Sequence, residues 1–148
     1  MVHVELQVEQ PPFSAKLIEG AVRETLALQA AAGDLTVVLS DDAQVRELNR
    51  KYLGIDASTD VLSFPAAETD PETGEAYLGD VIISVPQAEV QARAAGHPLE
   101  SEVQLLVVHG VLHLLGHDHA ESDARASMWA AQAGILRRLG LQGIVMRE

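Results

Sequence analysis

Three histidines within eleven residues are the side chains of this chain best suited to bind a metal ion. His109 and His113 stand four residues apart, and His119 follows shortly after them. Imidazoles four residues apart on a helix share one face and lie about 6 Å apart along its axis. Three neutral nitrogens at about 2.0–2.1 Å leave one tetrahedral position for water, which is the arrangement of a catalytic zinc.

The glycine at position 116 predicts how the third histidine reaches the other two. The stretch Val103–Leu115 is apolar nearly throughout and predicts a buried central helix. Gly116 directly after it favours a sharp left-handed turn that brings His119 toward the pair. On a straight helix His117 would lie about 12 Å from His109 along the axis, so it could bind only through a bend that serves His119 equally well. We therefore prefer His119 and interpret His117 as a pocket residue.

The residue types restrict the chemistry of this site. The chain has no cysteine, so a metal must be bound by nitrogen and oxygen ligands. Three imidazoles suit Zn²⁺, with nickel, cobalt or copper as alternatives. Gly110 stands where zinc peptidases carry their general-base glutamate, which argues against a peptidase and leaves metal-assisted hydrolysis open. A glycine inside a helix costs about 1 kcal/mol relative to alanine, so we expect close packing at Gly110.

Hydrophobic periodicity predicts an α+β fold over residues 1–148, with about four strands in one small mixed sheet and about five helices. Strands are expected at Val2–Glu9, Leu35–Leu39, Asp60–Phe64 and Leu78–Ser84, the last two forming an antiparallel pair through a loop that contains Pro65. Helices are expected from Ser14 to near Gly33, from a cap at Ser40 or Asp41 to about Tyr52 with Gly54 just past its end, from Pro86 to Ala94 or Ala95 with Gly96 as the stop, from His97 and Pro98 to Leu115, and from about Ser122 to Leu139. His3 and His97 are interpreted as surface or capping residues.

The net charge of the chain restricts how it can bind nucleic acid. It has 22 acidic and 10 basic residues, a net charge of −12, and should repel polyanions at long range. An RNA substrate would need a local basic strip and its binding would depend strongly on salt. Arg46, Arg50 and Lys51 are the candidates, opposite a predicted buried stripe that includes Tyr52; a solvated helix face is the alternative. No signal peptide or membrane-spanning stretch is expected, which favours a cytoplasmic protein.

Three stretches resemble the YbeY family of bacterial metal-dependent endoribonucleases, in the same order along the chain. They are Leu48–Tyr52 followed by Thr59–Pro65, Leu78–Ser84, and His109–His119. The resemblance implies a small sheet packed by helices, with His109, His113 and His119 as ligands of one zinc ion. It also implies cleavage of single-stranded RNA in 16S ribosomal RNA 3′ end maturation and in ribosome quality control. Ribosomal RNA and the small ribosomal subunit are then the expected partners, rather than DNA or a membrane.

Two positions depart from the family pattern. Leu53 follows Tyr52 where many members carry an arginine thought to contact the scissile phosphate. Arg50 or Lys51 then takes over that contact, or the phosphate is held in another way, or catalysis is weaker. His117 stands where members often have tyrosine.

The general base is left open by the sequence. Asp80, Asp118 and His117 are candidates, and the 2′-hydroxyl of the RNA is an alternative nucleophile. Asp118 is also a candidate acceptor for the second N–H of a ligand histidine. Two other functions are alternatives to RNA cleavage. The chain could be a metal-dependent hydrolase of another substrate, or a non-catalytic ribosome assembly factor with a structural metal.

Overall fold

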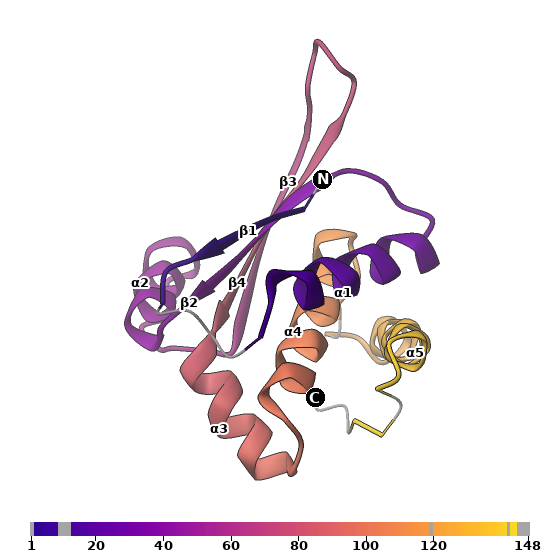
Figure 1. Ribbon diagram of the computed structural model, residues 1–148. Helices are drawn as coiled ribbons and strands as arrows, with labels where there is room; N and C mark the ends of the chain where they lie inside the picture. The colour runs from indigo at the N-terminus through magenta and orange to yellow at the C-terminus, as the bar shows by residue number, and fades with distance from the viewer. Residues whose placement is uncertain (1, 9–12, 119, 142, 145–148) are drawn as a thin grey trace.

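The computed structural model describes residues 2–8, 13–118, 120–141 and 143–144, and within them it has a four-stranded mixed sheet. The strands are β1 (Val2–Leu6), β2 (Asp34–Ser40), β3 (Val61–Thr69) and β4 (Ala76–Ser84), in the order β1-β2-β4-β3 (Figure 1). β1 and β2 run parallel, as do β2 and β4. β3 and β4 form the expected antiparallel pair. The predicted α+β class is therefore confirmed.

Five helices lie within the described residues, and most begin and end at the expected signals. They are α1 (Ala15–Leu28), α2 (Asp42–Leu53), α3 (Val85–Ala95), α4 (Leu99–Leu114) and α5 (Ser122–Arg138). Asp41 caps α2 by accepting a hydrogen bond from the Gln44 backbone N–H, and Gly54 follows this helix in the left-handed conformation. α1 ends several residues before Gly33, because Ala30 adopts the left-handed conformation (φ 51°) that closes the helix.

The helices cover the two faces of the sheet unequally. α4 packs on β3 and β4 and is surrounded by α1, α3 and α5, whereas α2 lies on the other face (Figure 1). The main core gathers around α4, which confirms that this helix is the buried central one. A smaller apolar cluster lies beneath α2 and consists of Val38, Val45, Leu62 and Ile82. No helix among the described residues is long and apolar enough to cross a bilayer.

The expected close packing at Gly110 is confirmed. A Cβ atom added there would lie 2.5 Å from Cγ1 of Val81 on β4, far inside van der Waals contact. Ser63 on β3 donates a hydrogen bond of 3.0 Å to the Gly110 carbonyl oxygen. The turn of α4 that carries His109 and His113 is thus held directly against the sheet.

Several expectations need correction. β1 ends at Leu6 rather than Glu9, and residues 9–12 lie outside the described part of the chain. Pro65 lies within β3 and not in the loop. Tyr52 is 59% exposed instead of buried. Its ring contacts Phe64 on the edge strand β3, with centroids 5.5 Å apart. Tyr52 therefore packs on the edge of the sheet rather than on its centre.

Candidate metal centre

The two histidines of α4 face each other through the same ring atom. Nε2 of His113 lies 3.2 Å from Nε2 of His109, and the ring planes meet at 73°. Two nitrogens bound to one tetrahedral zinc at 2.0–2.1 Å are separated by about 3.3 Å. Without a metal the same contact is a hydrogen bond. The pair therefore fits two ligand positions around one ion with little rearrangement.

A buried glutamine fixes the orientation of the first histidine. Oε1 of Gln132 on α5 lies 3.0 Å from Nδ1 of His109, and Gln132 is only 1% exposed. Because an amide oxygen only accepts hydrogen bonds, Nδ1 carries the proton and Nε2 keeps its lone pair. Metal-ligating histidines are typically held in this way. The arrangement thus presents Nε2 of His109 as a ligand atom.

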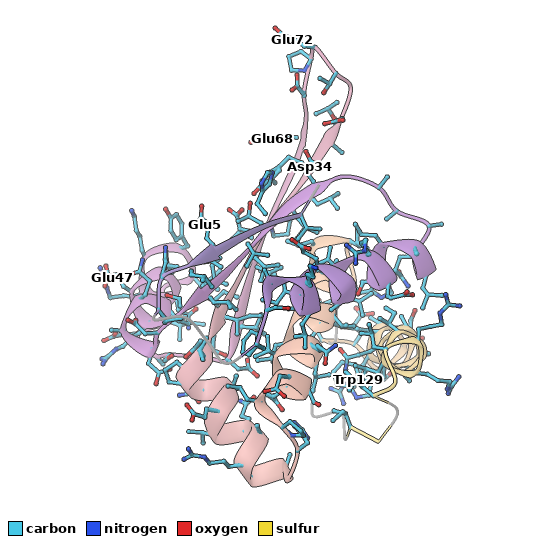
Figure 2. The ribbon with its side chains drawn as sticks, in the orientation of Figure 1. Glu5, Asp34, Glu47, Glu68, Glu72 and Trp129 are labelled. Atoms are coloured by element: carbon cyan, nitrogen blue, oxygen red, sulfur yellow. The ribbon has the colours of Figure 1, made fainter. Side chains whose placement is uncertain are left out.

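Sequence reasoning missed Gln132, because its contact with His109 depends on how α5 packs against α4. The signal was a glutamine on an otherwise apolar stripe of α5, together with Met128, Ile135 and Leu136. Trp129 on the same helix adds an aromatic contact. Its ring lies edge-on to His109 with centroids 6.0 Å apart, and Figure 2 labels it on α5. α5 therefore supplies both a polar and an aromatic neighbour to the site.

The turn after α4 has the predicted geometry. Gly116 adopts a φ of +98°, and the backbone N–H of His117 donates to the Leu112 carbonyl at 3.0 Å. Such a bond across a left-handed residue reverses the chain at a helix end. Nε2 of His117 lies 2.7 Å from Oε1 of Gln29, which ties this turn to the end of α1.

His119 lies outside the described residues, so its role as third ligand stays a prediction. In the described part of the chain, no group of three or more potential ligands is found. Two of the three predicted ligands are brought together, and position 119 follows the Gly116 turn in the sequence. Asp118 is exposed on this turn and stays a candidate general base or acceptor.

Asp80 lies away from the histidines, which argues against its role as general base. Its neighbour Val81 faces Gly110 on α4, and successive side chains of a strand point to opposite faces. Asp80 instead accepts a hydrogen bond from the Tyr77 hydroxyl, which also lies 2.8 Å from the Thr36 hydroxyl. Burial and the neighbouring Asp80 carboxylate raise the pKa of Tyr77.

Acidic partners compensate two of the three basic residues on α2. Arg46 binds Asp56 at 2.8 Å and Arg50 binds Glu47, all on the exposed surface. The hydrogen bonds of these pairs lower the pKa of both carboxyl groups. Lys51 differs, because its Nζ lies 5.2 Å from the centre of the Tyr52 ring. An RNA phosphate that binds either arginine must therefore compete with a carboxylate.

The two remaining histidines have different surroundings. His3 is exposed on β1, as expected. His97 is largely buried before the first turn of α4, where its Nε2 lies 2.6 Å from Oε1 of the fully buried Glu102. The expectation that His97 is a surface or capping residue is therefore corrected: it pairs with a carboxylate inside the protein.

Comparison with known proteins agrees with this architecture. The family model described as endoribonuclease YbeY matches residues 5–140. A Roseiflexus sp. (strain RS-1) protein named endoribonuclease YbeY is 45% identical over 93% of each chain, and one of the same name from Moorella thermoacetica is 43% identical over 88% of this chain and 92% of its own. The solution structure of a Thermotoga maritima protein shares the fold, with a TM-score of 0.60 and 23% identity over 95% of this chain and 92% of its own. The chain therefore belongs to the endoribonuclease YbeY family.

Proposed function

We propose that this endoribonuclease hydrolyses RNA phosphodiesters at one metal ion bound by His109, His113 and His119. The observation that carries the proposal is the facing pair of Nε2 atoms 3.2 Å apart, one of them oriented by Gln132. A bound metal ion would lower the pKa of water and polarise a phosphoryl oxygen. Zn²⁺ is the ion proposed, because three imidazoles match its preference, with nickel or cobalt as alternatives.

The residues of this chain have separable tasks in that site. His109 and His113 supply nitrogen ligands from a helix that is fixed against the sheet at Gly110. Gln132 keeps the proton of His109 on Nδ1, so that Nε2 is ready to bind. The hydrogen bond between His117 and Gln29 anchors the turn that leads to His119. A preformed arrangement of this kind loses little conformational entropy when it binds a metal.

Ribosomal RNA is the proposed substrate, at the 3′ end of 16S RNA on the small ribosomal subunit, together with a role in ribosome quality control. The support is family membership, since the relatives carry the name endoribonuclease. Such a substrate places the protein in the cytoplasm. Single-stranded RNA fits a net charge of −12 better than a duplex, because fewer phosphates need to be neutralised at once.

A cleavage assay on structured ribosomal RNA tests the proposed activity. The purified chain is incubated with the RNA, with and without a chelator, and the metal content is measured by elemental analysis. We expect cleavage within single-stranded segments, its loss with chelator and its return when Zn²⁺ is added. RNA that stays intact while a small ester or phosphate is hydrolysed would instead support a hydrolase of another substrate class.

Replacing Gln132 with leucine tests how the first ligand is oriented. Leucine is of similar size but accepts no hydrogen bond, so His109 loses the partner that fixes its tautomer. We expect the affinity for Zn²⁺ to fall about 10–100-fold, measured by competition with a chromogenic chelator. Gln132→Glu keeps an acceptor oxygen and should retain most of the affinity. Equal affinities for the wild-type chain and Gln132→Leu would contradict this role.

A further inference from the structure

Exposed apolar side chains gather at the end of α2. Tyr52, Leu53 and Ile55 are 59%, 55% and 53% exposed and lie within four positions of one another. The other large exposed apolar residues in the described part of the chain are Leu6, Leu28 and Val90, which lie on different elements. Scattered apolar residues are ordinary on a surface, but a contiguous group marks a binding surface. We call Tyr52, Leu53 and Ile55 the α2 patch.

The charges around the α2 patch favour a nucleic acid over an apolar protein surface. Three of the 10 basic residues of the chain, Arg46, Arg50 and Lys51, precede it within six positions, and the first two are paired with the carboxylates of Asp56 and Glu47. Lys51 places its ammonium group 5.2 Å from the centre of the Tyr52 ring. Proteins bind single strands by stacking bases on aromatic rings while nearby cations contact the phosphates. An exposed tyrosine beside a lysine is a small version of this arrangement.

Acidic residues lie beside the α2 patch, where Glu47 and Asp56 pair with Arg50 and Arg46, and also at the β3–β4 hairpin, whose sequence contains no basic residue. Figure 2 shows Asp34, Glu68 and Glu72 at the β3–β4 hairpin and the adjoining end of β2. The sequence has no lysine or arginine between Lys51 and Arg93. A polyanion is therefore repelled by the hairpin and approaches the protein more favourably at the end of α2.

Edge strand β3 connects the α2 patch with the metal centre through two consecutive residues. The Phe64 ring contacts Tyr52 on one face of the strand. The Ser63 hydroxyl on the other face donates to the Gly110 carbonyl, in the turn of α4 that carries His109. Among the described strands, β3 is the edge of the sheet and has no neighbour on its outer side. A flexible single strand that passes around this edge can therefore reach both places.

We infer that Tyr52 is a stacking subsite for a base of the RNA strand that enters the metal centre, with Lys51 contacting an adjacent phosphate. The inference rests on the proposed function and adds a recognition element to it. Contact with Phe64 limits the motion of the Tyr52 ring, so that little conformational freedom is lost when a base stacks on it. Stacking on one ring is tolerant of sequence, so this subsite recognises single-strandedness rather than a particular base.

Binding of a labelled 12-nucleotide single-stranded RNA to the metal-free protein tests this inference. Fluorescence anisotropy in the presence of chelator measures the Kd without any cleavage step. We expect Tyr52→Ala to weaken binding about tenfold and Tyr52→Phe to restore it, since phenylalanine keeps the stacking ring. Val90→Ala on α3 is the matched control, because Val90 is 62% exposed and lies outside the α2 patch. Its Kd should equal that of the wild-type chain.

An RNA of the same length in which the bases are replaced by abasic sites separates stacking from charge. We expect the wild-type chain and Tyr52→Ala to bind it equally. Three results would overturn the subsite. The two proteins bind the base-containing RNA equally, or Tyr52→Ala loses the same affinity for both RNAs, or the wild-type chain binds no RNA. If Tyr52→Ala binds normally while the wild-type chain cleaves RNA, only this inference fails. If RNA binds through Tyr52 and is never cleaved, only the proposed function fails.

Discussion

We expect His113→Ala to abolish RNA cleavage, down to the rate of the chelator-treated wild-type chain. The substitution removes one of the two facing Nε2 atoms, so the site loses a ligand from the rigid part of the structure. His113 is only partly buried, and alanine favours the helix, so the metal-free variant should stay folded. Its free energy of unfolding should change by no more than about 1 kcal/mol. Activity, bound metal and urea unfolding measured on the same preparation check this prediction.

His3→Ala is the matched control for this experiment. His3 is exposed on β1 and belongs to the edge of the sheet away from β3, so cleavage and metal content should stay at wild-type values. If instead His113→Ala unfolds, and removal of the metal unfolds the wild-type chain as well, the metal has a structural role. A non-catalytic assembly factor with a structural metal would then be the better account.

Gly110→Ala has the largest expected effect on stability. The new methyl group would lie 2.5 Å from Cγ1 of Val81, a fully buried and β-branched residue that has little freedom to move away. Overpacking of this kind costs about 1–3 kcal/mol, and it exceeds the gain of about 1 kcal/mol from better helix propensity. Urea unfolding of the metal-free chain measures the change in free energy.

Gly134→Ala provides a control of opposite sign. Gly134 also lies inside a helix, α5, but a Cβ atom added there would meet nothing within 4 Å. We expect this variant to be more stable than the wild-type chain by up to about 1 kcal/mol. If Gly110→Ala is stabilised to the same extent, α4 does not pack as closely on Val81 as a contact of 2.5 Å requires.

Local signals in the sequence were sufficient to locate most helices. Asp41, Gly54 and Gly96 mark helix ends because they act on neighbouring backbone groups, and these ends are confirmed. The antiparallel pair of β3 and β4 was also predicted, since the two strands are close in sequence. The insertion of β2 between β1 and β4 was not predicted. Pairing of distant strands depends on how the whole core closes, and no short pattern encodes it.

In the candidate site too, a contact within one helix could be predicted, whereas a contact between helices could not. The spacing of His109 and His113 on one helix was sufficient to place both rings together. The partner Gln132 lies on another helix, and its contact depends on how α5 packs against α4. Tyr52 was misplaced for a related reason. Helical periodicity puts it on the inner side of α2, but the sheet is too narrow there to cover its ring.

Zinc K-edge X-ray absorption tests the central claim most directly, because it reports the atoms bound to the metal. The metal-free chain is loaded with one equivalent of Zn²⁺ and compared with His113→Ala treated in the same way. The account predicts imidazole nitrogens at about 2.0–2.1 Å in the wild-type chain and fewer of them in the variant. A wild-type spectrum without imidazole ligands, or one that the substitution leaves unchanged, would contradict it.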